Sequence, residues 1–183
     1  MKTNLLIAVI NLVKDPVINL KSHYKSVNMA NNMGDALEFY VKDLFCNSLH
    51  ENNLEKKIKI HQEYFSWLGN QNHPPDFIIE HGDAIEVKKI ESFKSALALN
   101  SSPPKDKLSV TDKRVTSDCK KCDGGSWKEK DLFYVIGNTN GGVVKYLFFV
   151  HGTCYAADYK VYDKIHSPIK KEVDSVLDSL GLD

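Results

Sequence analysis

Two carboxylates and a lysine lie within one short, largely apolar segment of this chain, residues 75–88. Asp76 precedes a first apolar run, and Glu86 and Lys88 stand two residues apart in a second run that begins after Gly82. Residues i and i+2 of a strand project from the same face, so Glu86 and Lys88 should point together. A hairpin around Gly82 would also bring the carboxylates of Asp76 and Glu86 close together. Two carboxylates beside an ammonium can hold a divalent metal and a water, which is equipment for hydrolysing a phosphodiester bond.

A third acid, Glu38, lies upstream of this hairpin in a segment with helical periodicity. Apolar residues recur at helical spacing from 33 to about 49. Glu38 follows Gly34 by one turn, and this glycine would let the helix approach other backbone closely. Glu38 is therefore a candidate third carboxylate. The alternative for these acids is an ordinary surface, with polar side chains on the wet face of a hairpin and an exposed glutamate on a helix.

The elements that must position these acids follow from the apolar patterns. A short N-terminal helix is expected at 4–13, ended by Pro16. A charged helix should begin near residue 51 and end with the aromatic residues at 64–68. After the hairpin, residues 92–131 show little periodicity, and their length indicates either a functional loop system or local order.

The C-terminal half of the chain predicts a second hairpin followed by helices. Apolar runs at 132–136 and 143–150 flank a turn rich in asparagine and glycine. Helical patterns follow at 156–165 and 169–180, with Pro168 as the break between them. The order of helices, hairpin, long loop, hairpin and helices predicts an α/β fold with a mixed central β-sheet flanked by helices.

The composition is that of a globular protein. Of 183 residues, 42% are hydrophobic and 26% are charged, which predicts one domain, 1–183, with a core of its own. No apolar run has the length of a membrane span. Four cysteines make no disulfide scaffold, and polar residues follow the apolar start at once, so a cytoplasmic location is expected. The net charge of zero counts against a nucleic-acid binder but does not exclude a local basic patch.

The acid-bearing helix, Pro75-Asp76 and Glu86-Val87-Lys88 together resemble the PD-(D/E)xK nuclease superfamily, which implies a restriction-endonuclease-like core. Longer strings resemble the NgoPII family of type II restriction endonucleases more closely, and this likeness runs through most of the chain. The strings are NNMGDALE (31–38), NHPPDFII (72–79), GDAIEVKK (82–89), LALNSS (97–102), CKKC (119–122) and CYAA (154–157).

This resemblance implies a Mg²⁺-dependent enzyme that cuts double-stranded DNA at a short palindrome, which is GGCC for this family. Cutting both strands of a palindrome calls for two sites related by a two-fold axis, so a homodimer is expected. A DNA methyltransferase of the same specificity would be the functional partner. Family members are expected to continue beyond the position of Asp183, so a C-terminal part of the DNA-binding or dimer surface is expected to be missing here.

The candidate acids take roles that fit both the residues and the resemblance. Asp76 and Glu86 would hold one or two Mg²⁺ ions, with the carbonyl of Val87 as a further oxygen ligand. Lys88 would position or deprotonate the attacking water and neutralise charge on the phosphate. Glu38 would complete a second metal position or hold a metal-bound water.

The segment after the catalytic strand should lie beside the cut DNA, because it leaves that strand directly. Its lysines suit phosphates, and its amide and hydroxyl side chains suit base edges in the major groove. A flexible surface loop is the alternative for the whole segment. The candidate DNA contacts are Asn100, Ser101, Ser102, Lys105, Lys107 and, on the catalytic strand itself, Lys89.

The spacing of Cys119 and Cys122 is that of half a zinc site, and His151 and Cys154 could supply the other half. A core cysteine is the commoner finding at the end of an apolar strand, so structural Zn²⁺ competes with plain packing. Two rival functions stay open at this stage. One is a repair or structure-specific nuclease with the same core, and the other is a non-catalytic DNA-binding module with a zinc-pinned loop.

Overall fold

The computed structural model describes residues 2–25, 33–70, 73–92 and 104–181. The helices and strands follow one another as α1 (Leu5–Lys14), α2 (Leu20–His23), α3 (Met33–Cys46), α4 (Leu54–Tyr64), β1 (Phe65–Trp67), β2 (Phe77–Ile79), β3 (Ala84–Ile90), β4 (Lys107–Ser109), α5 (Ser117–Lys121), η2 (Cys122–Gly125), β5 (Glu129–Asn140), β6 (Val143–His151), α6 (Gly152–Tyr155) and α7 (Tyr159–Ser179).

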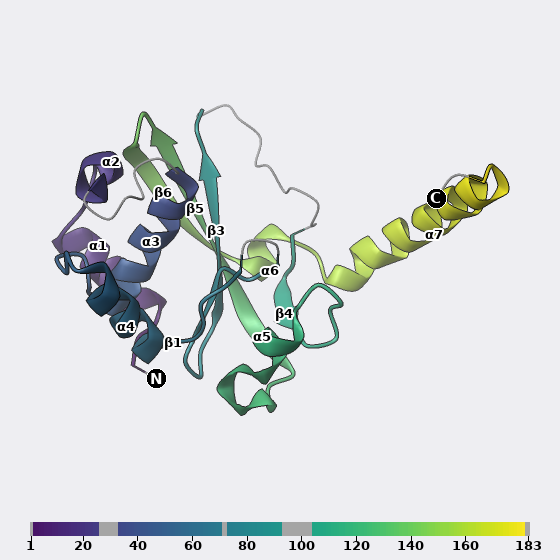
Figure 1. Cartoon of the computed structure of the whole chain (residues 1–183), viewed down its shortest axis with the longest axis horizontal. Helices are drawn as coiled ribbons and strands as arrows, with labels where there is room; N and C mark the ends of the chain where they lie inside the picture. The colour runs from purple at the N-terminus through teal and green to yellow at the C-terminus, as the bar shows by residue number, and fades with distance from the viewer. Residues whose placement is uncertain (1, 26–32, 71–72, 93–103, 182–183) are drawn as a thin grey trace.

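A six-stranded mixed sheet forms the centre of the protein. The strand order is β1-β2-β3-β5-β4, and β6 pairs with β5. Strands β3 and β5 are parallel, while the other neighbours are antiparallel. Helices α1 to α4 lie on one side of the sheet, and α5 and α6 lie on the other (Figure 1). The predicted α/β fold with a mixed sheet flanked by helices is therefore confirmed.

Apolar side chains fill both faces of the sheet, which explains the continuous apolar runs of the central hairpin. Phe77 and Ile85 pack in one cluster with residues of α1 and α3. Ile78 and Ala84 pack in a second cluster with residues of β4, α5 and β5. Since neighbouring residues of a strand face opposite sides, a strand covered on both faces needs apolar residues throughout.

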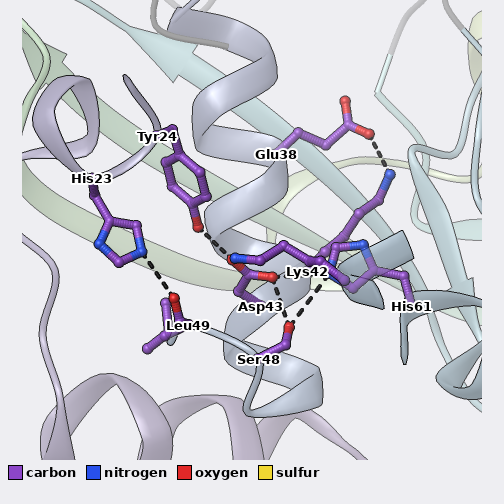
Figure 2. Close-up of polar contacts among 9 residues, drawn as sticks. His23, Tyr24, Glu38, Lys42, Asp43, Ser48, Leu49 and His61 are labelled. Carbon is purple, nitrogen blue, oxygen red and sulfur yellow. Dashed lines mark hydrogen bonds and ion pairs between the residues drawn. The ribbon is translucent and has the colours of Figure 1, made fainter. Parts of the chain in front are cut away.

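Helix α3 is fastened to its neighbours by a buried network around Asp43, which has no solvent exposure. Its carboxylate contacts Lys57 Nζ at 2.5 Å, Tyr24 OH at 2.6 Å, Ser48 Oγ at 2.7 Å and His61 Nε2 at 2.9 Å. Figure 2 shows Tyr24, Ser48 and His61 converging on this acid. Burial raises the pKa of Asp43, but the bonds from His61 and Lys57 outweigh it and hold this pKa below its usual value.

The short strand β1 corrects the prediction that residues 64–68 end a helix. Helix α4 stops at Tyr64, and Phe65 and Trp67 then pair with β2. Aromatic residues are favoured in half-buried strands, and β2 offers an edge with which such a strand can pair. Tertiary pairing thus overrides the helical continuation that the sequence favours.

Two predictions about the C-terminal half also need correction. Pro168 does not separate two helices but lies inside α7, and the helix expected from residue 156 begins at Tyr159, after the separate turn of α6. A proline removes one helical hydrogen bond, here to the carbonyl of Lys164. Because Lys164 is exposed, water can replace that bond. Within 104–131, β4, α5 and η2 confirm the alternative of local order.

Candidate active site

The hairpin expected around Gly82 is present. Strands β2 and β3 are antiparallel, with Phe77 opposite Ile85. One residue further along this register, Asp76 lies across from Glu86. The Gly82 amide closes the turn by donating to the Ile79 carbonyl at 2.8 Å. The predicted proximity of the two carboxylates follows directly from this pairing.

A buried ion pair between Lys130 of β5 and Asp123 of η2 holds the turn of this hairpin in place. Lys130 Nζ donates to the Gly82 carbonyl at 2.9 Å and to Asp123 Oδ2 at 2.6 Å. Asp123 Oδ1 in turn accepts a hydrogen bond from the His81 amide at 3.0 Å. The His81 imidazole itself is exposed. The turn is therefore held through its backbone.

Asp76 is the most strongly perturbed acid of the site. Its Oδ2 accepts a hydrogen bond from the Val87 amide at 2.5 Å. The pKa of Asp76 lies well above its usual range because burial disfavours the charge, and the carboxylates of Glu86 and Glu38 add repulsion. The Val87 amide and Lys88 offset only part of this effect. The structure thus brings all three predicted acids near one another.

Glu86 and Lys88 point together from β3, as the strand period predicts. Lys88 Nζ lies 2.6 Å from Glu86 Oε1, and both side chains are largely buried. Burial lowers the pKa of Lys88, but the ion pair with Glu86 and the charge of Asp76 outweigh it and raise this pKa. The other oxygen of Glu86, Oε2, is buried and has no hydrogen-bond partner among the described residues.

Glu38 belongs to the site together with a lysine that sequence reasoning missed. Lys42, one helical turn further along α3, is buried and places its Nζ 2.6 Å from Glu38 Oε1 (Figure 2). The same Nζ donates to the Leu68 carbonyl at 3.2 Å. Lys42 therefore ties the Glu38 carboxylate to the loop that leads towards Asp76. The spacing of four residues was the available sequence signal, but it also marks ordinary surface pairs on helices.

The backbone of Asp76 is packed against Gly69, a second contact that sequence reasoning missed. Gly69 has φ +82°, and a Cβ placed on it would lie 2.3 Å from the Asp76 carbonyl oxygen. Trp67 Nε1 also donates to the Pro75 carbonyl at 3.1 Å. Trp67 and Gly69 thus fix the backbone of Pro75 and Asp76.

The charge balance of the site suits an added cation. Three carboxylates meet two lysines, Lys42 and Lys88, and each lysine already pairs with one acid. Among the described residues, no lysine or arginine forms an ion pair with Asp76, whose charge Lys88 offsets only in part, and no donor reaches Glu86 Oε2. Among the described residues, no three acids, histidines or cysteines stand in a finished metal-binding arrangement. The orphaned oxygen and the mutual repulsion of the acids nevertheless fit a divalent ion with oxygen ligands.

The residues predicted to contact DNA differ in their accessibility in the structure. Asn100, Ser101 and Ser102 lie outside the described residues. Lys105 is buried in an ion pair with Asp112 at 3.0 Å, so its ammonium is not available to a phosphate, and that expectation is withdrawn. Lys107 and Lys89 are accessible, although each has a carboxylate neighbour, Asp131 at 3.5 Å and Glu91 at 2.8 Å.

The suggested zinc site is not assembled. Cys119 and Cys122 are buried and hydrogen-bonded to each other, which lowers the pKa of Cys122 to about 7. Cys154 is exposed, and His151 Nδ1 contacts Thr153 Oγ1 at 2.8 Å. No group of three metal-ligating side chains occurs in the described part of the chain. Cys119 and Cys122 pack in the second apolar cluster. Cys154, just after β6, is not the core cysteine that the alternative predicted, because it is exposed.

A family model of the NgoPII restriction endonuclease matches residues 3–179. This chain belongs to the NgoPII restriction endonuclease family. It is similar to the type II restriction enzyme NgoPII of Neisseria gonorrhoeae, with 48% identity over 174 residues. The alignment covers 94% of this chain and 62% of the relative, so the chain spans less than two thirds of the relative's length. No solved structure matches.

The region matched to the NgoPII family includes every acid and lysine of the candidate site. Glu38, Asp76, Glu86 and Lys88 all fall inside residues 3–179. Across the described segments, no helix has the length and apolar character needed to cross a membrane. The family match therefore spans the whole candidate site.

Proposed function

We propose that this chain acts as a type II restriction endonuclease, which hydrolyses phosphodiester bonds of double-stranded DNA at the palindrome GGCC with Mg²⁺. The observation that carries the proposal is the convergence of Asp76, Glu86, Glu38 and Lys88 in a chain of the NgoPII family. Residues 1–183 would form one nuclease domain that works as a homodimer in the cytoplasm. A DNA methyltransferase of the same specificity would protect the cell's own GGCC sites.

Asp76 and Glu86 are the residues proposed to hold Mg²⁺, with the Val87 carbonyl as a further oxygen ligand. Glu38 would complete a second metal position or hold a metal-bound water. When bound, the ion acts as a Lewis acid and lowers the pKa of a coordinated water. The raised pKa of Asp76 supports this assignment, because a cation removes the repulsion among the three carboxylates.

Lys88 is proposed to orient the attacking water and to neutralise charge on the phosphate. Its raised pKa keeps the ammonium protonated at neutral pH, and a protonated lysine cannot accept the proton of water. Orientation and charge neutralisation are therefore favoured over the role of a base. Lys107 and Lys89 would contact DNA phosphates, and Asn100, Ser101 and Ser102 are proposed to contact DNA as well.

Digestion of a plasmid that carries several GGCC sites tests the activity. With Mg²⁺ we expect discrete fragments, and with EDTA we expect none. Sequencing the fragment ends should show that each cut falls within GGCC. A smear of fragments would instead indicate a nonspecific nuclease of the same fold. DNA binding without cutting would favour a non-catalytic module.

The variant Lys88→Ala tests the site itself. Loss of one group that stabilises developing charge in the transition state typically slows a reaction by about 10²–10³-fold. We expect a loss of this size in the cleavage rate, with DNA affinity close to that of the unaltered chain. Lys121→Ala is the matched control, because this exposed lysine forms an ion pair on the surface with Asp118 of α5. Unchanged cutting by Lys88→Ala would exclude the assignment.

A further inference from the structure

Tyr155 lies on the same face of the sheet as Glu86 and Lys88. Ala84 of β3 packs in the second apolar cluster, and the strand period of two brings Glu86 and Lys88 to the side of Ala84. Tyr155 packs against this second cluster from α6, the short helix after β6. The face that bears the candidate site therefore also carries a tyrosine to which the proposed mechanism gives no role.

The pairing of β3 with β5 places Tyr155 beside the site. Glu86 stands next to Tyr134 in the parallel register, and the ring centroids of Tyr134 and Tyr155 lie 4.7 Å apart. Tyr155 also interacts electrostatically with the ammonium of Lys88. One aromatic ring thus lies between Tyr155 and the strand position of Glu86, and the hydroxyl of Tyr155 lies within electrostatic reach of Lys88.

Close backbone packing fixes the position of Tyr155. Gly152 begins α6, and a Cβ placed on it would lie 2.1 Å from the Asp106 carbonyl oxygen, so α6 packs directly on the segment before β4. Tyr134 is tied to the same segment, because its hydroxyl accepts from the Lys105 amide at 2.7 Å and donates to the Lys105 carbonyl at 3.2 Å. Tyr155 therefore rests on a ring that is itself held by hydrogen bonds.

The hydroxyl of Tyr155 differs from those of two neighbouring tyrosines. The Tyr134 hydroxyl is bonded to backbone, and the Tyr162 hydroxyl accepts from the Ala157 amide at 3.2 Å. Among the described residues, no hydrogen bond is found for the hydroxyl of Tyr155. Burial raises the pKa of Tyr155 and the charge of Lys88 offsets only part of this rise, so the phenol keeps its proton at neutral pH. A phenol and an ammonium side by side are two donors, and such a pair suits an anion.

We propose that Tyr155 is a further catalytic residue, whose hydroxyl donates a hydrogen bond to an oxygen of the DNA phosphate that Lys88 neutralises. This inference rests on the proposed function, because it takes the substrate to be a phosphodiester. Negative charge on that phosphate increases as water attacks, so a donor already in place stabilises the transition state more than the bound substrate. Tyr155 keeps its proton throughout and acts as a donor only.

Tyr155→Phe tests this role, because it removes the hydroxyl and keeps the ring that packs on Tyr134. Loss of one donor to developing charge typically slows a reaction by about 10²–10³-fold, and we expect this loss in the cleavage rate at saturating DNA and Mg²⁺. The urea midpoint should stay close to that of the unaltered chain. Tyr64→Phe is the matched control and should cut normally, because Tyr64 ends α4 and packs against the first apolar cluster. A lower urea midpoint with an unchanged rate per folded molecule would show a structural role and overturn the proposal.

DNA affinity gives a readout that does not depend on cutting. A methylphosphonate linkage replaces one charged oxygen of a phosphate with a methyl group, and a GGCC duplex can carry it at each position in turn. With Ca²⁺ in place of Mg²⁺, Tyr155→Phe should raise the Kd of the unmodified duplex about tenfold, the effect of one lost hydrogen bond to a charged group. This difference should disappear at one linkage position. A difference that is absent from the unmodified duplex, or that persists at every position, would overturn the proposal.

The two measurements separate this inference from the proposed function. A chain that cuts GGCC, and whose Tyr155→Phe variant cuts equally fast, keeps the function and loses the inference. A chain that binds the duplex but does not cut it loses the function, and the affinity differences then decide the phosphate contact. A chain that binds no DNA loses both.

Discussion

Replacing Gly69 with alanine tests how far the site depends on the backbone of Asp76. Gly69 has φ +82°, and an added Cβ would lie 2.3 Å from the Asp76 carbonyl oxygen and 3.0 Å from its carbonyl carbon. Both atoms belong to the backbone, so no side-chain rotation can relieve the overlap. The strand entrance that carries Asp76 must move instead.

Gly124 supplies the matched control for the conformational part of this change. It has φ +77°, and an added Cβ there would meet nothing within 4 Å. The left-handed conformation costs a residue with a Cβ about 1–2 kcal/mol, so Gly124→Ala should lose about that much stability. Gly69→Ala also introduces a steric overlap with the Asp76 backbone, and overpacking of this kind typically costs a further ~1–3 kcal/mol. A displacement of Asp76 by about 1 Å should also slow cleavage about 100-fold.

Urea unfolding of both variants gives the stability changes, and the rate of DNA cleavage in excess Mg²⁺ gives the functional change. We expect Gly69→Ala to be the less stable variant and the only one of the two with slow cleavage. Equal stability losses in Gly69→Ala and Gly124→Ala would show that the backbone of Asp76 moves away from the added Cβ at little energetic cost. Normal cleavage by a destabilised Gly69→Ala would show that the position of Asp76 does not limit the reaction, and the proposed site would need revision.

Two further substitutions probe the buried charges. Asp76→Asn should abolish cleavage and also stabilise the metal-free chain at neutral pH by about 0.5–2 kcal/mol, because it removes repulsion from Glu86 and Glu38; lower stability in urea would contradict this. Asp43→Asn should cost about 3–5 kcal/mol, because it leaves Lys57 charged and buried without its partner. Asp43 has a lowered pKa, so its contribution is present above the ordinary aspartate pKa and is lost as the pH falls through the lowered value. The urea midpoint should therefore fall less steeply with decreasing pH in Asp43→Asn than in the unaltered chain. An equally steep fall would show that other groups cause the acid sensitivity.

The central hairpin could be predicted because its signals are local. Strand period places Glu86 and Lys88 on one face, and the turn at Gly82 sets the register that brings Asp76 opposite Glu86. These relations need no knowledge of the rest of the fold. Because strand period and turn register depend only on neighbouring residues, the structure shows the hairpin geometry that the sequence predicts.

The contacts that hold the site could not be predicted, because they join segments far apart in the chain. Lys42 contacts the Leu68 carbonyl, and Gly69 packs on Asp76, in a region where β1 pairs with β2. Lys105 failed as a DNA contact for a similar reason. Its side chain turns inward to Asp112, and nothing in the local sequence of a proline- and lysine-rich segment signals a buried ion pair.

Helix α3 links the stability of the fold to the geometry of the site. Glu38 and Asp43 lie five residues apart on this helix, so they project in clearly different directions. Glu38 meets Lys42 and the charge of Asp76, while Asp43 binds donors from α4 and from Tyr24 after α2. The position of Glu38 relative to the hairpin therefore depends on how firmly the Asp43 network holds α3 between its neighbours. For this reason Asp43→Asn should slow cleavage even where the chain remains folded, whereas loss of stability alone would lower only the folded fraction. Cleavage rates corrected for that fraction separate the two effects, and an unchanged corrected rate would show that α3 keeps Glu38 in place without the network.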